Sequence, residues 1–306
     1  MGMSGMYGAS DDTESIATIH RAIDQGVNLL DTGDFYGSGH NEMLIGKAIE
    51  GRRNSILLSV KFGAMRTPDG GFSGMDNRPA AIKNFLAYTL QRLRTDHIDI
   101  YRPARLDPSV PIEETVGAIA DLIKAGWVRH VGLSEMGVET IRRAHAVHAV
   151  VDLQIEYAII SRGPESAIFP ALRELGIGVT AYGVLSRGLL SGSKPNGAKD
   201  YRAHLPRFTG DNLERNQRLV DTLNAIAREK NATASQLAIA WVLAKGENIV
   251  PIPGARKRTQ LDEALAALNL QLTPDDLRRI ETAIPATEVA GTRYDGHGMK
   301  MLDSEK

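Results

Sequence analysis

The chain of 306 residues has no cysteine, few aromatic residues, no long apolar run and almost no net charge. Without cysteine it forms no disulfide, and it has neither a thiolate zinc ligand nor a cysteine nucleophile. Its 36 basic and 37 acidic residues leave a formal charge of -1, so charge draws it neither to nucleic acid nor to an anionic membrane. No signal peptide is visible, and no apolar run approaches the roughly 18 residues of a membrane span. These absences predict a cytoplasmic protein without nucleic-acid or membrane partners.

What is present is the composition of a globular protein, because hydrophobic residues make up 42% of the chain and charged residues 24%. Short apolar runs alternate with amphipathic stretches along it. The runs expected to form buried parallel strands are 28–32, 55–62, 98–102, 128–134, 151–157, 178–185 and 248–253. Helices are expected from Pro79 through Leu93, from Ile112 to a stop at Gly126, and at 41–49, 137–149, 166–175, 213–230, 233–245, 257–267 and 273–283.

Strand followed by helix, repeated around seven times, predicts parallel βα units, either in an open sheet or in a closed (β/α)8 TIM barrel. No strand leads into a Gly-rich dinucleotide fingerprint or a P-loop, which favours the barrel. A barrel needs eight strands, so Met1–Gly5 is interpreted as the tail of a first strand truncated at the N-terminus. We expect one domain over residues 1–306. The polar segment 186–211 is too long for an ordinary connection and is expected to act as a lid.

Three polar residues follow neighbouring apolar runs, where a parallel barrel builds its active site. Asp31 lies at the end of the run at 28–32, and Tyr36 follows that run. Lys61 lies at the end of the run at 55–62. A phenol has a pKa of roughly 10, too high for efficient proton donation near neutral pH unless a cation stabilises its phenolate. Lys61 is expected to supply that cation and Asp31 to orient it, so that Tyr36 acts as general acid. The alternative is a structural Asp–Lys pair with a tyrosine packed beside it.

Residues 31–37 (DTGDFYG) resemble the Asp-Thr-Ala-x-x-Tyr-Gly motif of the aldo-keto reductases, and Lys61 falls where that family places its lysine. Further similar segments follow in order over nearly the whole chain, at 131–134, 152–154, 181–189 and 251–256. The resemblance implies a (β/α)8 barrel that reduces a small carbonyl compound with NADPH. It also implies that Tyr36, Lys61 and Asp31 are the catalytic residues.

The same resemblance implies a binding site for NADPH or NADP along the rim. Ser134 and Gln154 would hydrogen-bond the nicotinamide carboxamide, and the ring of Tyr182 would stack on the nicotinamide. The backbone of 183–189 would wrap the pyrophosphate. Residues 254–258 carry three cations at a helix start, which suits the 2′-phosphate of NADPH, although such a run is also common on solvated surfaces. The further cofactor contacts expected are Gly183, Leu185, Arg187, Gly188, Gly254, Arg256, Gln260 and Glu263.

One position in the expected active site departs from the family pattern. Ala104 stands where the family usually has a histidine that points at the substrate carbonyl, and a methyl group can neither donate a hydrogen bond nor titrate. Arg102 and His97 are the nearby candidates to replace it. Glu135 and Ala264 stand where asparagines are common near the nicotinamide and the adenine. Pyridoxal-reducing members of the family resemble the chain around Ala104 and also lack the histidine.

Carbonyl reduction, with hydride from NADPH and a proton from Tyr36, is therefore the leading hypothesis. The alternative is a catalytically weak sensor or regulatory subunit that holds NADPH, which the loss of the histidine at Ala104 would suit. An unrelated barrel hydrolase or metal enzyme has little support, because the eight histidines are scattered and His145 and His148 share a helix expected at the surface. No metal site is expected, and the oligomeric state and the carbonyl substrate stay open.

Overall fold

A curved parallel sheet forms the centre of the computed structural model, which describes residues 2–5, 10–197 and 200–306. Its seven strands follow one another in the order β1-β2-β5-β6-β7-β8-β9, and every neighbouring pair is parallel. Their bounds are Leu29–Gly33, Leu57–Phe62, Ile98–Pro103, Val128–Ser134, Val150–Glu156, Gly178–Tyr182 and Ile249–Pro251. A separate antiparallel hairpin joins β3 (Ala64–Arg66) to β4 (Phe72–Met75).

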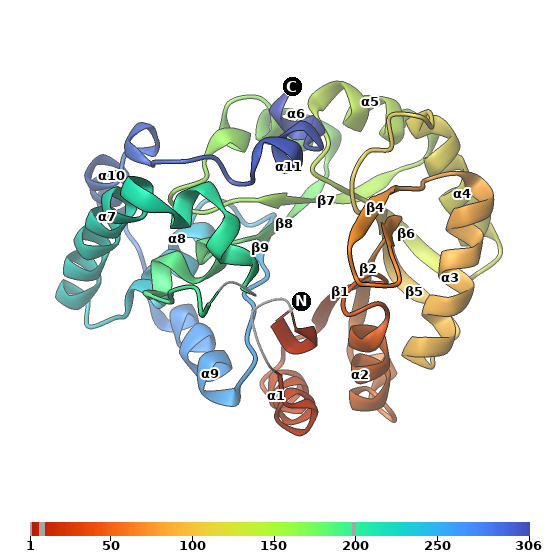
Figure 1. Ribbon diagram of the computed structural model, residues 1–306, viewed down its shortest axis with the longest axis horizontal. Coiled ribbons are helices and arrows are strands. Elements are labelled where there is room, and N and C mark those ends of the chain that lie inside the picture. Colours follow the sequence, from red (N-terminus) through yellow and green to blue (C-terminus); the bar gives the residue numbers. More distant parts are fainter. Residues whose placement is uncertain (1, 6–9, 198–199) are drawn as a thin grey trace.

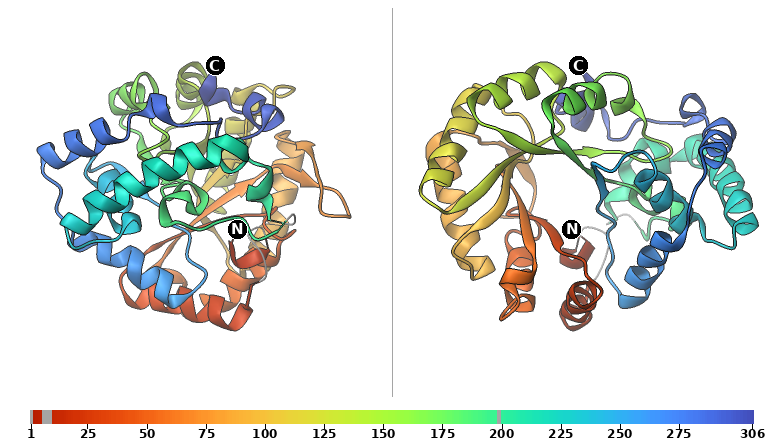
Figure 2. Two further views of the ribbon diagram at one scale, coloured as in Figure 1. Left: turned by 60° about the vertical axis from the view of Figure 1, so that its left-hand side comes forward. Right: turned by 180° about the vertical axis from the view of Figure 1, so that it is seen from behind.

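Helices surround this sheet on its outer side (Figures 1 and 2). They are α1 Asp12–Asp24, α2 His40–Ala48, α3 Pro79–Leu93, α4 Ile112–Lys124, α5 Val138–Val147, α6 Ile168–Leu175, α7 Gly210–Glu229, α8 Ala234–Leu243, α9 Arg258–Ala266, α10 Pro274–Ala283 and α11 Gly296–Lys300. Short 3-10 turns are η1 Gly2–Ser4, η2 Arg53–Ser55, η3 Gly163–Glu165, η4 Ser186–Ser191, η5 Tyr201–His204, η6 Pro206–Phe208, η7 Ala267–Asn269, η8 Ala286–Glu288 and η9 Asp303–Glu305.

The alternation of strand and helix is that of a (β/α)8 barrel, here with seven strands and no pairing of β9 with β1 among the residues described. Strands in this layer are apolar because each lies between the helices and the barrel interior. Leu58, Val60 and Leu133 are completely buried in that core. Since all strands run the same way, their carboxyl ends meet on one rim, where β1 and β2 pair Gly33 with Lys61.

All seven predicted strands are present, and their ends shift by a few residues at most. The largest difference is β8, which stops at Tyr182 instead of Leu185 because Gly183 turns the chain with φ +68°. The prediction of strand in Met1–Gly5 is wrong for the described residues of that stretch, since Gly2–Ser4 form the 3-10 turn η1; Met1 itself lies outside the described residues. Short, Gly-containing segments without β-branched residues have little preference for strand.

Helix α1 and the β3–β4 hairpin were not predicted. Asp11 caps α1 by accepting from the backbone N–H groups of Thr13 and Glu14, and an aspartate before an apolar repeat is a recognisable helix start. The hairpin turns at Pro68-Asp69-Gly70, whose residue types favour a tight turn.

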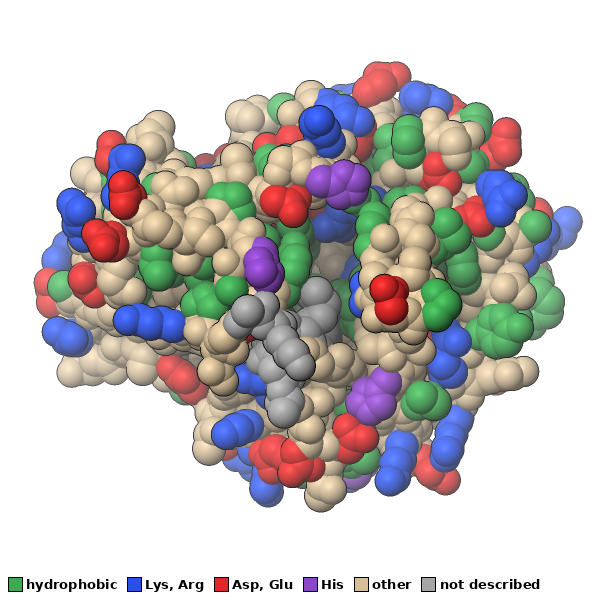
Figure 3. All heavy atoms as spheres, in the orientation of Figure 1, with side chains coloured by type: hydrophobic (Ala, Val, Ile, Leu, Met, Phe, Trp, Pro, Cys, Tyr) green, Lys and Arg blue, Asp and Glu red, His purple; other side chains and the backbone are tan. Residues whose placement is uncertain are grey.

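The rim faces the viewer in Figure 1, and the same face is hollowed at its centre in Figure 3, beside the β3–β4 hairpin. The segment expected to be a lid folds in its described part into η4, η5 and η6, and Leu190, Leu205 and Phe208 within it are buried. No helix in the described parts of the chain has the length and apolarity needed to cross a bilayer.

Candidate functional site

Asp31 and Lys61 form a buried ion pair at the carboxyl ends of β1 and β2. The register of the two strands places them almost side by side, because Gly33 pairs with Lys61 and Asp31 with Ser59. The other carboxylate oxygen of Asp31 accepts from Ser59 Oγ at 2.8 Å and from Gln154 Nε2 at 2.7 Å. Both oxygens of Asp31 are thus engaged, so its carboxylate holds a fixed position under the rim.

The charge states of this pair follow from burial and from the mutual attraction. Burial alone raises the pKa of Asp31, but the charges of Lys61 and Arg102 and two hydrogen bonds bring it below its usual value. Burial lowers the pKa of Lys61, and Asp31 opposes that change. Asp31 is therefore anionic. Its charge stabilises the ammonium of Lys61, a residue that is only 3% exposed.

Tyr36 lies over this ammonium. Its side chain is 8% exposed, and Lys61 Nζ lies 5.2 Å from the centre of its ring. A turn carries it there from the end of β1, with the N–H of Tyr36 donating to the carbonyl of Gly33 at 3.0 Å. Phe35 packs edge-on against the ring at 4.7 Å between centroids. The structure thus brings together the three residues that the sequence singled out.

Neither Arg102 nor His97, the two residues expected to stand in for a histidine at position 104, lies at the rim beside Tyr36. The guanidinium of Arg102 is completely buried inside the barrel, where it binds Asp152 at 2.9 Å and Ser59 Oγ at 2.9 Å. Ser59 precedes Lys61 by two residues on the same strand, so Arg102 lies one layer below the rim. His97 precedes β5 and so lies at the opposite end of the barrel, with its ring 2.6 Å from Asp96.

Arg105 is the arginine at the rim, and it was not among the site residues predicted from the sequence. Its Nη1 donates to the carbonyl of Ala104 at 2.6 Å and lies 3.4 Å from Ser134 Oγ, while Nη2 donates to Tyr294 Oη at 3.2 Å. No strand pattern marked it, because β5 ends at Pro103 and the alternation of side chains along the strand stops before Arg105.

Ser134, Gln154 and Tyr182 lie at or near the carboxyl ends of three consecutive strands around the same rim. Ser134 pairs with Gln154 across β6 and β7, and Tyr182 closes β8. Ser134 and Gln154 are buried, at 1% and 3% exposure, whereas Tyr182 is partly exposed. The three polar side chains lie beside Asp31 and Arg105, within the same ring of strand ends.

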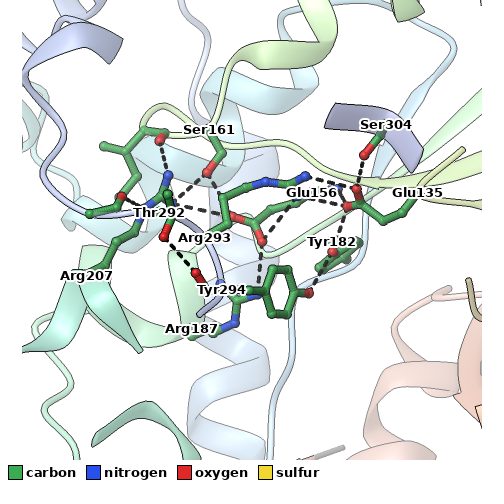
Figure 4. A network of polar contacts seen from close by, with 12 residues as sticks. Glu135, Glu156, Ser161, Tyr182, Arg187, Arg207, Thr292, Arg293, Tyr294 and Ser304 are labelled. Carbon is green, nitrogen blue, oxygen red and sulfur yellow. Dashed lines mark hydrogen bonds and ion pairs between the residues drawn. The ribbon is translucent and has the colours of Figure 1, made fainter. Parts of the chain in front are cut away.

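A carboxylate that the sequence listed only as a departure, Glu135, organises the neighbouring wall (Figure 4). It is fully buried, accepts from Tyr182 Oη at 2.7 Å, and pairs with both Nη atoms of Arg293 at 2.9 and 3.0 Å. Burial alone raises the pKa of Glu135, but Arg293, Arg105 and Ser304 bring it to about 2. The C-terminal segment is therefore fastened to the rim by a charge pair.

Tyr294 extends this wall over the site. Its hydroxyl lies 2.9 Å from Tyr182 Oη, and the guanidinium of Arg187 lies 4.4 Å from its ring centre (Figure 4). Arg187 also donates to Glu156 at 3.0 Å. No sequence signal marked Tyr294, because 112 residues separate it from Tyr182.

The segment after β8, which was expected to wrap a pyrophosphate, consists of backbone in the left-handed region. Four of its residues have positive φ: Gly183 at +68°, Ser186 at +48°, Arg187 at +58° and Gly188 at +94°. The Ser186 hydroxyl is buried and has no hydrogen-bond partner among the described residues. Leu185 is partly exposed beside it. Successive turns of this kind point backbone N–H groups into a shared concavity that suits an anion.

The basic segment before α9 is partly occupied by internal contacts. Arg258 pairs with Glu14 of α1 at 3.0 Å, and the backbone N–H of Arg256 donates to Gln260 Oε1 at 2.9 Å. Glu263 accepts from Thr233 Oγ1 at 2.8 Å. Gly254 is exposed, and a side chain there would meet nothing within 4 Å. The side chain of Arg258 remains 57% exposed in this pair, and Lys257 is exposed as well.

Comparisons with known proteins identify the family of this chain. A profile of the aldo/keto reductase family matches residues 1–285. "Probable aldo-keto reductase 1" of Glycine max is 40% identical over 303 residues, covering 96% of this chain and 86% of the relative. The glycerol dehydrogenase of Gluconobacter oxydans has a TM-score of 0.84 at 27% identity, over 92% of this chain and 88% of that one. The holo form of a Bacillus halodurans aldo-keto reductase has a TM-score of 0.77 at 27% identity, over 96% and 93%.

A Klebsiella pneumoniae aldo/keto reductase in complex with NADP and acetate shares the fold, with a TM-score of 0.73 at 24% identity over 95% of this chain and 91% of that one. A parallel βα barrel with a lysine–aspartate pair beside a tyrosine at its carboxyl rim is the architecture of a barrel oxidoreductase. The chain belongs to the aldo/keto reductase family.

Proposed function

We propose that this chain reduces an aldehyde or ketone with NADPH, with Tyr36 as the proton donor. The observation that carries the proposal is the position of Lys61 Nζ, 5.2 Å from the ring centre of Tyr36 and paired with the partly buried Asp31. The cation stabilises the phenolate that remains after Tyr36 gives its proton to the carbonyl oxygen. Asp31 and Gln154 hold the ammonium and the carboxylate in place during that transfer.

The rim fits a dinucleotide. Bound NADPH supplies the hydride that the reduction requires. Ser134 and Gln154, which pair across the adjacent strands β6 and β7, present side chains for a carboxamide, and Tyr182 presents a ring for stacking. The left-handed backbone from Gly183 to Gly188 and the unpartnered Ser186 hydroxyl suit a pyrophosphate. The NADP named for the Klebsiella pneumoniae structure supports this assignment.

The 2′-phosphate is assigned to the cationic segment 254–258, which runs into the start of α9 and carries Arg256, Lys257 and Arg258. Gly254, Gln260, Glu263, Leu185 and Arg187 remain proposed cofactor contacts. A sensor that binds NADPH without turnover has no support in the comparisons, whose names are those of reductases and a dehydrogenase. We also propose a cytoplasmic location, since the chain has no cysteine and a balanced charge.

The test is the oxidation of NADPH with a panel of aldehydes, ketones and pyridoxal, followed at 340 nm. Tyr36→Phe is expected to abolish turnover and to leave NADPH affinity, measured by fluorescence, within about twofold of the unmodified chain. Tyr88→Phe, at an exposed position of α3, is the matched control and is expected to keep full activity. Full turnover in Tyr36→Phe, or no oxidation with any carbonyl compound, would refute the proposal.

A further inference from the structure

The guanidinium of Arg105 lies over the residue where the family's histidine is missing. Its Nη1 donates to the carbonyl of Ala104 at 2.6 Å, so the side chain folds back along the chain toward a methyl group that is 3% exposed. The backbone beneath it is fixed on both sides. Ala104 N–H donates to Phe62 at 2.8 Å, and Asn77 Nδ2 donates to the carbonyl of Arg105 at 2.9 Å.

The positive charge of Arg105 acts on the catalytic residues. Burial lowers the pKa of Lys61, and the charge of Arg105 lowers it further, which places the guanidinium close to the ammonium. Burial alone would lower the pKa of Arg105, but its interactions raise it; the groups responsible are Tyr182, Tyr294, Glu135 and Tyr36. Arg105 is thus a permanent cation that interacts electrostatically with both Tyr36 and Tyr182.

Arg105 differs from the other buried arginines in what it binds. Each of those pairs with a carboxylate; the pairs are Arg102–Asp152, Arg187–Glu156, Arg202–Asp200, Arg207–Glu156 and Arg293–Glu135. Within the described residues, no carboxylate oxygen lies within 4.0 Å of Arg105. Its acceptors there are a backbone carbonyl and two hydroxyls, whereas a guanidinium carries five N–H groups. Arg105 is partly exposed, so its remaining N–H groups are available to a ligand at the rim.

We propose that Arg105 is a catalytic residue that polarises the substrate carbonyl oxygen, in place of the histidine absent at position 104. The inference rests on the proposed carbonyl reduction. The hydride adds to the carbonyl carbon, the π electron pair moves to the oxygen, and the proton of Tyr36 Oη bonds to that oxygen. Arg105 keeps all its protons and donates an N–H hydrogen bond to the same oxygen while its charge develops.

The test compares Arg105→Gln and Arg105→Lys with the unmodified chain, using an uncharged aromatic aldehyde and NADPH. Arg218→Gln, at an exposed position of α7, is the matched control. Removing one such donor costs on the order of 10²-fold in rate, so we expect kcat of Arg105→Gln to fall about 100-fold with little change in NADPH affinity. Arg105→Lys, which keeps the charge, is expected to lose less, and added guanidinium ion to restore part of the activity of Arg105→Gln.

A second readout does not require turnover. Acetate presents an anionic oxygen like that of the developing alkoxide, and its binding to the chain saturated with NADP is measured by titration. We expect the acetate affinity of Arg105→Gln to fall at least tenfold and that of Arg218→Gln to stay unchanged. If the unmodified chain reduced no aldehyde but bound acetate through Arg105, the proposed reduction would fail and the assignment of Arg105 to an oxyanion would stand.

Two results overturn the proposal. One is equal acetate affinity in Arg105→Gln and the unmodified chain. The other is a loss in Arg105→Gln that appears only as a raised KM for carboxylate-bearing aldehydes, with kcat for the uncharged aldehyde unchanged. That second pattern would make Arg105 a binding group for an acidic substrate.

Discussion

Replacing Asp34 by asparagine is expected to stabilise the protein at neutral and alkaline pH. Burial and the nearby carboxylate of Glu42 raise the pKa of Asp34 from 3.8 to about 7, against the opposing charge of Arg92. One oxygen of Asp34 is buried without a hydrogen-bond partner among the described residues. Glu42 is itself completely buried, where it accepts from Thr89 at 2.7 Å. The fold therefore favours a neutral group at position 34.

The sign and size follow from proton linkage. Between pH 3.8 and about 7 the folded chain keeps a proton on Asp34 that the unfolded chain has lost, so the free energy of unfolding falls as pH rises. Each unit of pKa difference is worth 1.36 kcal/mol, which makes the whole penalty about 4 kcal/mol. Below pH 3.8 both states are protonated and the penalty vanishes; above pH 7 both are ionised and the penalty is constant.

The assay is urea unfolding of Asp34→Asn and the unmodified chain at intervals from pH 4 to pH 8. The difference between the two free energies cancels the contributions of other groups, and it should grow from near zero at pH 4 to about 4 kcal/mol at pH 8. Asp221→Asn, at an exposed position of α7, is the control and should give a flat difference. A flat difference for Asp34→Asn would show that the raised pKa does not exist.

Three further substitutions test charge and packing in the barrel. Glu135→Gln should lower the free energy of unfolding by about 3 kcal/mol at pH 7, because the pKa of Glu135 is lowered from 4.5 to about 2 in the folded state. That stability is present above pH 4.5 and is lost as pH falls toward 2, so a difference that stays constant down to pH 3 in urea unfolding would contradict it. Gly132→Ala should destabilise by about 1–3 kcal/mol in thermal unfolding, because a Cβ there would lie 2.7 Å from Ile100 Cγ2 and 3.1 Å from Arg102 Cζ. Gly117→Ala in α4, where nothing lies within 4 Å, should instead stabilise by about 0.5–1 kcal/mol, and equal effects of the two would refute the steric argument.

Much of the fold could be predicted because its determinants are local. The seven strands are continuous apolar runs bounded by glycine or polar residues, and the helices between them carry a 3.6-residue repeat. Neighbouring strands in the sheet are also consecutive along the chain in every case, apart from the intervening hairpin. The ends of elements were less certain, since a single left-handed residue such as Gly183 ends β8.

Asp31, Tyr36 and Lys61 could be placed together from the sequence because parallel strands end on one rim. Their contact required only the pairing of β1 with β2, two strands adjacent in the chain. The direction of a side chain near a strand end could not be read in the same way. Arg102 turns inward to Asp152 and Arg105 outward to Tyr294, and the choice depends on partners 50 and 189 residues away.

The sequence by itself determined the succession of parallel βα units and the meeting of Asp31, Tyr36 and Lys61 at one rim, because both rest on short-range patterns and on the shared direction of parallel strands. Only the tertiary structure decided that Arg105 and not Arg102 lies at the rim, and which residues close the wall beside it. Arg293 reaches Glu135 across 158 residues, and a contact of that length depends on how the chain's end folds back over the rim. No local pattern encodes such a contact, since its energy comes from the mutual attraction of two charges that meet only once the barrel has formed.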